Sequence, residues 1–188
     1  MFAPSRTSAG LRAVERIKGS PLLLAYERTR TGHDDVVLSL GDYVHRCDSY
    51  YFGVEASAGL YPHHLAVMIR MLDQWRECLE RLAEGDRCFL PFDFSDQCTA
   101  WLRCERLAGG EVRIRAGWSS IEGWSCLPSD FSAHAGDVPD WRAIENSAAI
   151  TTPRSALLTQ IAASQAALRS QASTLESGIR AGDRRTKR

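Results

Sequence analysis

Hydrophobic residues change their spacing several times along the 188-residue chain, and these changes mark the expected elements. Between residues 62 and 83 they recur every three or four positions, with charged residues on the opposite face. This spacing predicts an amphipathic helix, packed on one side and exposed on the other. Pro62 suits a first helical turn, and Gly85 stands where a left-handed residue commonly ends a helix.

Alternation in steps of two predicts strands on both sides of this helix. The segments are residues 36–40 and 50–55 before the helix and 88–94, 98–106, 111–118 and 121–127 after it. The Ala108-Gly-Gly110 run predicts a hairpin, and Pro91 predicts a sheet edge or a bulge because proline has no N–H to donate. We therefore expect an α+β fold, with an antiparallel sheet of five to six strands, one long amphipathic helix packed on it, and a C-terminal helix.

The ends of the chain are less regular than its middle. Residues 1–20 are rich in Ser, Ala, Gly and Arg, and we expect a loosely ordered N-terminal segment over residues 1–33. The α+β core domain is expected over residues 34–131, followed by a linker over 132–150. Residues 151–188 predict an Ala/Ser/Gln-rich helix with a basic tail, and its weak hydrophobic stripe predicts partial order.

Charge is unevenly distributed although the formal net charge is zero. Residues 1–33 carry six basic and two acidic side chains, residues 34–145 carry ten and nineteen, and residues 146–188 carry seven and two. The acidic centre argues against nucleic acid as a partner of the core, because DNA binding requires basic side chains. The same charge would attract a basic protein partner and speed the encounter.

Cysteine and histidine spacing predicts no metal site and no cofactor. None of the six cysteines forms a C-x-x-C pair, so we expect free thiols that pack as small hydrophobic residues. The adjacent His63 and His64 diverge by about 100° on a helix and cannot chelate together. No apolar run is long enough to span a membrane and no secretion signal is evident, so the expected location is cytoplasmic.

The candidate binding surface lies between Phe89 and Trp124, where aromatic and acidic residues are dense. Alternation puts Cys98, Ala100, Leu102 and Cys104 inside, which leaves the residues between them on the opposite face. Asp93 and Asp96 flank a turn, and carboxylates there are also ordinary turn formers. The alternative for the tryptophans is that a second layer covers them. The predicted partner-binding residues are Asp93, Asp96, Trp101, Arg103, Glu105, Trp118, Glu122 and Trp124.

Four short stretches carry a resemblance to a known class of proteins: residues 90–97, 101–104, 117–118 and 122–125. Their sequences are LPFDFSDQ, WLRC, GW and EGWS. Together with the expected architecture over about residues 36–131, they resemble the small cytosolic immunity proteins of bacterial polymorphic-toxin and contact-dependent inhibition systems. The resemblance implies a non-catalytic protein that neutralises a cognate toxin by binding it.

Two alternatives remain open from the sequence. One is a small cytosolic hydrolase that uses a cysteine or a carboxylate between Phe92 and Trp101. The other is a non-catalytic adaptor that oligomerises through the C-terminal helix. The oligomeric state and the order of the tail are likewise left open.

Overall fold

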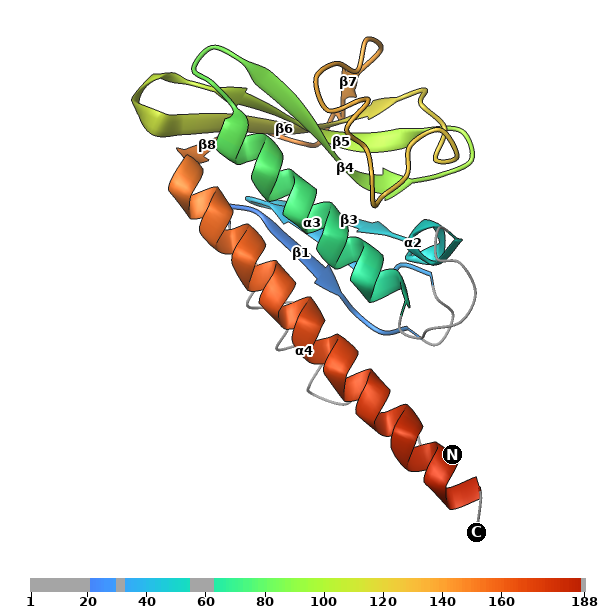
Figure 1. Ribbon diagram of the computed structural model, residues 1–188. Coiled ribbons are helices and arrows are strands. Elements are labelled where there is room, and N and C mark those ends of the chain that lie inside the picture. Colours follow the sequence, from blue (N-terminus) through green and yellow to red (C-terminus); the bar gives the residue numbers. More distant parts are fainter. Residues whose placement is uncertain (1–20, 30–32, 55–62, 187–188) are drawn as a thin grey trace, which may run out of the picture.

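The computed structural model describes residues 21–29, 33–54 and 63–186, with side chains as far as residue 177 (Figure 1). Its strands form two antiparallel sheets. In the three-stranded sheet the order is β1 (Leu23–Tyr26), β2 (Val36–Leu40) and β3 (Tyr43–Cys47). The five-stranded sheet contains β4 (Arg87–Phe94), β5 (Thr99–Arg106), β6 (Glu111–Ser119), β7 (Arg142–Ala143) and β8 (Ile150–Pro153), and both β7 and β8 pair with β6.

The helices are α2 (Tyr50–Val54), α3 (His63–Arg81) and α4 (Arg154–Thr186), with a 3₁₀ turn η1 (Ala108–Gly110) between β5 and β6. The α+β class, the antiparallel sheet of five strands and the long C-terminal helix are confirmed. The expected strands are divided between two sheets, because β1–β3 pair only with one another among the described strands. No helix in the described ranges is both long enough and apolar enough to cross a membrane.

The predictions that rest on glycine and proline in turns are confirmed. Gly85, after α3, and Gly109, in the β5–β6 hairpin, have φ of 85° and 72°, a region that glycine enters without steric cost. The register of β4 against β5 shifts between Pro91 and Asp93. Proline thus marks a bulge, as expected from its missing donor.

Two strand predictions are wrong. Residues 50–54 form the helix α2, because the Asp35 carboxylate accepts bonds from the Ser49 N–H and hydroxyl, both at 2.7 Å, just before its first turn. Phe52 is its buried residue and packs edge-on against Phe94 with ring centroids 5.4 Å apart. Residues 121–127 form turns, with an isolated bridge between Leu127 and Asp130.

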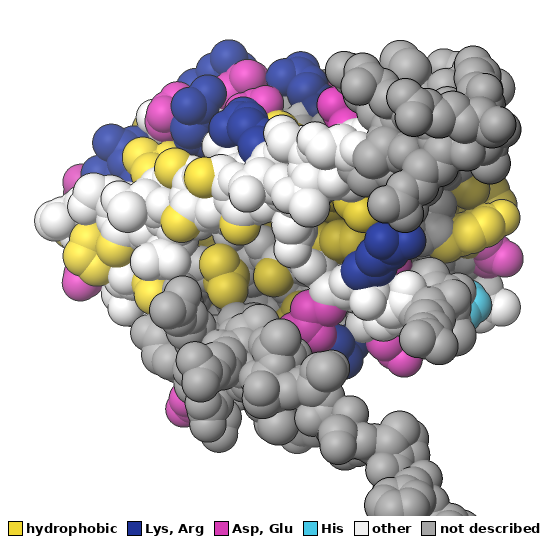
Figure 2. Space-filling view, turned by 90° about the horizontal axis from the view of Figure 1, so that it is seen from below, with side chains coloured by type: hydrophobic (Ala, Val, Ile, Leu, Met, Phe, Trp, Pro, Cys, Tyr) yellow, Lys and Arg dark blue, Asp and Glu magenta, His cyan; other side chains and the backbone are white. Residues whose placement is uncertain are grey.

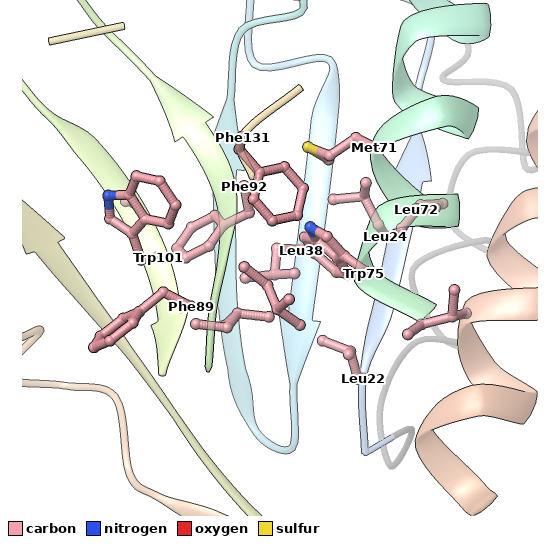
Figure 3. Packing of buried hydrophobic residues seen from close by; sticks show 14 of the residues in the cluster. Leu22, Leu24, Leu38, Met71, Leu72, Trp75, Phe89, Phe92, Trp101 and Phe131 are labelled. Carbon is pink, nitrogen blue, oxygen red and sulfur yellow. The ribbon is translucent and has the colours of Figure 1, made fainter. Parts of the chain in front are cut away.

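One hydrophobic cluster joins both sheets and the two long helices (Figure 3). Met71 and Trp75 extend from α3 into it, and the Trp75 indole N–H donates to the carbonyl of Pro91 at 3.1 Å. The sequence predicted that α3 is packed on one side only. This is wrong, because α3 also packs along α4. Its exposed face keeps the ion pairs of the amphipathic pattern, including Arg81 with Glu77 at 3.6 Å.

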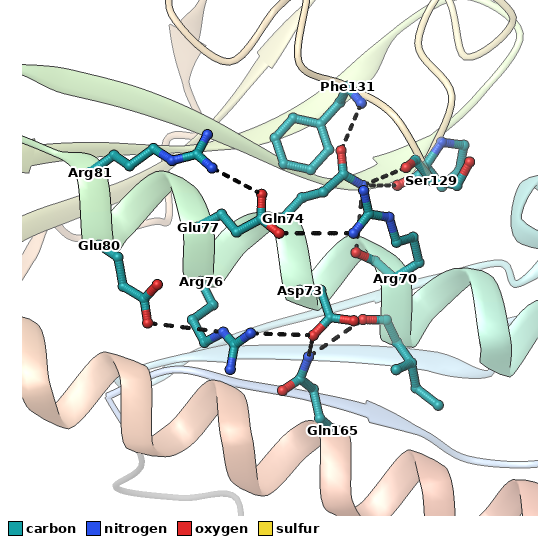
Figure 4. A network of polar contacts seen from close by, with 12 residues as sticks. Arg70, Asp73, Gln74, Arg76, Glu77, Glu80, Arg81, Ser129, Phe131 and Gln165 are labelled. Atoms are coloured by element: carbon teal, nitrogen blue, oxygen red, sulfur yellow. Dashed lines mark hydrogen bonds and ion pairs between the residues drawn. The ribbon is translucent and has the colours of Figure 1, made fainter.

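α4 is ordered and lies against α3 and β1, so the expectation of partial order is wrong for its first half. Leu157, Ile161 and Leu168 are buried along it. Polar residues complete the contact: Ser164 accepts the N–H of Leu24 at 3.2 Å, and Gln165 donates to Asp73 at 2.8 Å (Figure 4). The hydrophobic stripe is weak because these buried, hydrogen-bonded side chains replace apolar ones.

The N-terminal segment is likewise ordered in part, because β1 falls within residues 1–33, and Leu24 of β1 and the preceding Leu22 are buried. Residues 1–20 lie outside the described part. The lower face of the molecule in Figure 1 carries hydrophobic side chains scattered among uncharged polar ones, with acidic and basic side chains mixed along one edge (Figure 2).

Candidate functional site

Trp101 is fully buried, so its predicted place in a binding surface is wrong. Its indole N–H donates to the Ser119 hydroxyl at 2.9 Å, and the ring packs edge-on against Phe131 and His134. Trp101 and Phe89 lie on the face of the five-stranded sheet away from α3 (Figure 3). A second layer therefore covers this tryptophan, which is the alternative that the sequence left open.

The covering layer comes from the segment expected to be a linker. Gln74 of α3 anchors its start, since the amide donates to the Ser129 carbonyl at 2.7 Å and accepts the Phe131 N–H at 3.3 Å (Figure 4). Further along, Val138 and Ser147 are buried and β7 pairs with β6. Residues 132–150 are thus part of the folded domain.

The other two candidate tryptophans have different environments. Trp118 is half-buried under His45, with ring centroids 5.7 Å apart. Trp124 has 54% of its surface exposed, in a loop that is tied down by a 2.7 Å bond from the Gly123 N–H to the carbonyl of Ser95. Three residues that look alike in the sequence therefore serve as core, as partial cover and as surface.

Asp93 and Asp96 line a cavity of about 770 Å³ where β3 and α2 meet the β4–β5 turn, at the α2 end of the molecule (Figure 1). Other charged residues converge on the same cavity. We call it the acidic hollow and define it by Asp34, Asp48, Asp93 and Asp96 with His33 and Arg46. Its carboxylates outnumber its cations. In addition, the charge of Arg46 is already paired with Glu27 at 2.8 Å.

Asp48 is the best-held carboxylate of the acidic hollow. It accepts the Asp34 N–H at 2.8 Å and bonds the His33 ring at 2.7 Å. Burial raises the pKa of Asp48, but these two hydrogen bonds outweigh burial and leave the pKa below its usual value. The hydrogen bond to Asp48, followed by its charge, raises the pKa of His33.

His45 connects the two sheets through one ring nitrogen, and its other ring nitrogen contacts a neighbour on its own strand, β3. Nε2 donates to the Asp93 carboxylate at 2.7 Å, and Nδ1 lies 3.1 Å from the Tyr43 hydroxyl. The ring also packs edge-on against Phe92 and Trp118. Burial, and then the charge of Asp93, raises the pKa of Tyr43. With both nitrogens occupied, the structure gives His45 a role in joining β3 to β4.

Tyr50 and Tyr51 line the acidic hollow, and Trp124 packs against Tyr51; we call these three aromatic residues the aromatic rim. Tyr51 contacts Tyr50 and Trp124 edge-on, with ring centroids 5.4 and 5.3 Å apart. A Cβ on Gly123 would lie 3.1 Å from the Tyr51 ring, so glycine permits this approach. Tyr50 is 58% exposed, so the rim presents aromatic surface to solvent.

Most of the residues of the hollow and its rim were not predicted from the sequence. Tyr50 and Tyr51 were interpreted as strand positions, and Asp34 and Asp48 were not singled out. The sequence does carry a signal for them, since charged and aromatic residues are dense between His33 and Tyr51, outside the predicted surface at residues 89–124. The hollow joins these two stretches, which are far apart in the chain.

Arg103 and Glu105 do not belong to the acidic hollow. They lie on the outer face of β5 and form an ion pair with each other, and Arg113 of β6 is 3.7 Å from Glu105. Glu122 is exposed in the loop that carries Trp124. The predicted partner-binding residues are therefore distributed over two separate places on the surface and the core between them.

The six cysteines are free thiols. Burial raises the pKa of Cys78 to about 11, and a hydrogen bond to Cys88, followed by burial, raises the pKa of Cys104. These groups are protonated at neutral pH. Within the described ranges, no group of three His, Cys, Asp or Glu side chains could hold a metal ion.

Comparison with known proteins identifies no family. No family model matches the chain, and no curated protein matches it. The chain is distantly similar to the crystal structure of a protein of unknown function of the DUF155 family from Prochlorococcus sp. NATL2A. The sequence identity is 10%, the match covers 78% of this chain and 94% of the other, and the TM-score is 0.29. We draw no functional argument from it.

Proposed function

We propose that this protein is a protein-binding module that holds a basic segment of a partner in the acidic hollow. More specifically, we propose an immunity protein that neutralises a cognate bacterial toxin by direct binding. The observation that carries the proposal is the convergence of four aspartates and two tyrosines on one cavity, with Trp124 packed against one of these tyrosines.

Charge supports a basic partner. The Asp34 and Asp96 carboxylates have no ion-pair or hydrogen-bond partner among the residues that the structure describes, and both residues are exposed. Lysine or arginine side chains of a partner would satisfy them with charge-assisted hydrogen bonds. The negative potential of the hollow would also steer such a partner during encounter.

The aromatic rim supports a protein as the bound species. Tyrosine and tryptophan are enriched among the residues that dominate binding energy at protein interfaces. Tyr50 exposes a large ring in a cavity lined by carboxylates, so a basic side chain can contact the ring face while its charge meets an aspartate. Trp124 adds exposed aromatic surface beside Tyr51. The cavity is open and broad enough for several side chains of a partner.

The toxin is the narrower part of the proposal. It rests on the resemblance of residues 90–97, 101–104, 117–118 and 122–125 to immunity proteins. Many toxin domains are nucleases with basic substrate clefts. A carboxylate-rich surface would occupy such a cleft in place of nucleic acid.

The test is binding to the product of the neighbouring open reading frame, measured by calorimetry with purified proteins. Asp96→Lys and Trp124→Ala should each weaken binding at least tenfold, because one reverses a charge of the hollow and the other removes a ring of its rim. Asp42→Lys, at the exposed β2–β3 turn, is the matched control and should bind as the wild type does. Wild-type affinity in both hollow variants would contradict the proposed site.

Two other outcomes would replace the proposed function. Hydrolase activity in a broad substrate screen, lost on substitution of one cysteine or aspartate between Phe92 and Trp101, would favour an enzyme. An oligomeric mass that rises with concentration, and that falls to the monomer mass when the residues after Leu175 are removed, would favour an adaptor that oligomerises through α4.

A further inference from the structure

A second, smaller cavity lies on the outer face of β5 and β6, away from the acidic hollow. Its volume is about 160 Å³, and it is lined by Arg103, Glu105, Arg113, Arg115, Trp141 and Ala149. We call it the arginine pocket. Three guanidinium groups face it with a single carboxylate, so its formal charge is positive where that of the hollow is negative.

The strand register creates this excess of positive charge. Arg103 of β5 stands directly opposite Arg115 of β6, and Glu105 stands opposite Arg113. Like charges opposite each other destabilise a sheet. Glu105 compensates in part, since it pairs with Arg103 and lies 3.7 Å from Arg113. No carboxylate of the described residues pairs with Arg115.

Arg115 is held in place without being neutralised. Its Nε donates to the carbonyl of Ser147 at 3.2 Å. Ser147 is itself fixed, because it is buried and its hydroxyl accepts the Ala116 N–H at 3.2 Å. The two terminal nitrogens of Arg115 have no partner among the described residues, so the guanidinium presents donors in a set direction.

Trp141 forms the wall of the arginine pocket. The Arg103 guanidinium carbon lies 5.5 Å from the centre of its ring, within the range of a cation–π contact. The indole N–H donates to the Trp101 carbonyl at 3.4 Å, and the ring packs on Gly117, where a Cβ would lie 2.2 Å from it. The ring therefore limits the freedom of Arg103 as Ser147 limits that of Arg115.

We propose that the arginine pocket binds a phosphate-like oxyanion, free or as the terminal group of a small phosphomonoester. Planar guanidinium groups match the oxygens of such an anion and bind them through paired hydrogen bonds. The volume is below the roughly 300–1,000 Å³ of sites that enclose a whole ligand, so it suits one charged group. This site is independent of the proposed toxin partner, because it shares no lining residue with the acidic hollow.

The experiment measures binding of inorganic phosphate and of phenyl phosphate to the full chain by NMR, against chloride at equal ionic strength. We expect shifts of the Trp141 indole N–H and of β5 and β6 amides that saturate with millimolar or lower Kd. Arg115→Gln should raise this Kd at least tenfold, and Arg103→Lys should raise it as well. Arg87→Gln, on β4 outside the pocket, is the matched control and should leave it unchanged.

Saturation by both probes would support a site that also accepts esters, and saturation by phosphate alone would support a site for the free anion. The proposal is overturned if neither probe exceeds the effect of chloride, or if Arg115→Gln binds as tightly as the wild type. Neither result would bear on the proposed function, whose variants Asp96→Lys and Trp124→Ala lie elsewhere.

Discussion

The acidic hollow and the arginine pocket are built in the same way but with opposite charge. In each, a segment distant in sequence packs on the five-stranded sheet: β3 and α2 at the hollow, and residues 141–149 at the pocket. The hollow is broad, with carboxylates held by histidines, whereas the pocket is about 160 Å³ and has guanidinium groups held by Glu105 and Ser147. The larger volume and negative charge of the hollow suit a basic protein partner, whereas the smaller volume and positive charge of the pocket suit a single anion.

The largest expected effect is on stability, and it should differ between Trp101, buried behind the arginine pocket, and Trp124, exposed in the aromatic rim. Trp101→Ala should lower the free energy of unfolding by about 3–5 kcal/mol, because a fully buried indole leaves a cavity. Trp124→Ala should lower it by less than about 1 kcal/mol, since the side chain is largely exposed. Urea denaturation measures both values. Similar losses in the two variants would show that their burial does not differ as described.

Gly117→Ala should damage the arginine pocket and spare the hollow. A Cβ at this position would lie 2.2 Å from the Trp141 ring and 2.5 Å from the Arg142 carbonyl, so the ring must move. We expect a loss of about 1–3 kcal/mol in unfolding free energy, together with loss of phosphate binding.

Gly136→Ala is the control for this substitution, because a Cβ there meets nothing within 4 Å. Denaturation and the phosphate titration give the two readouts. Unchanged phosphate binding in a folded Gly117→Ala protein would show that the position of Trp141 does not matter to the pocket.

A smaller effect concerns how pH changes the charge of the hollow. The pKa of His33 is raised above 6.5 by Asp48, so the contribution of this pair to stability is present below pH 6.5 and is lost as pH rises through the raised pKa. The hollow then becomes more negative and should bind a basic partner more tightly. NMR titration of His33 should show the raised pKa, and Asp48→Asn should return it toward 6.5. A wild-type His33 pKa at or below 6.5 would contradict the pair.

The smallest effect is expected for the reactivity of the thiols of Cys78 and Cys104, which contribute to neither the acidic hollow nor the arginine pocket. With the pKa of Cys78 at about 11, its thiolate fraction at pH 8 is on the order of one in a thousand. Iodoacetamide should therefore alkylate Cys78 and Cys104 slowly in the native protein and quickly in urea, as mass spectrometry can measure. Rapid native labelling of Cys78 would argue for a reactive thiol.

Elements controlled by local spacing could be predicted from the sequence. The stripe of α3, the bulge at Pro91 and the hairpin at Ala108–Gly110 depend on neighbouring residues, and each is found. The α2 segment could not be predicted in this way. Its alternation suggests a strand, but Asp35, fourteen residues before Ser49, accepts two hydrogen bonds from Ser49 at the start of a helix.

The candidate site could be predicted only where it depends on local sequence. Alternation placed Trp101 on the outer face of β5 correctly but could not show that Phe131 and Trp141 cover that face. Asp93 and Asp96 were recognised from their turn, whereas Asp34 and Asp48 reach the same cavity through the pairing of β2 with β3. Which distant segments meet is decided by tertiary packing, which no local pattern reports.

The contact between β1 and α4 has a consequence for how the chain is made. Leu24 is bonded to Ser164, and 140 positions separate the two. At a synthesis rate of about 5–20 residues per second, β1 waits on the order of ten seconds for the helix that covers it. Until then Leu22, Leu24 and the apolar face of α3 lack part of their final cover. Folding of β1 is thus tied to the synthesis of α4, and we expect a ribosome that stalls before residue 164 to leave an aggregation-prone intermediate.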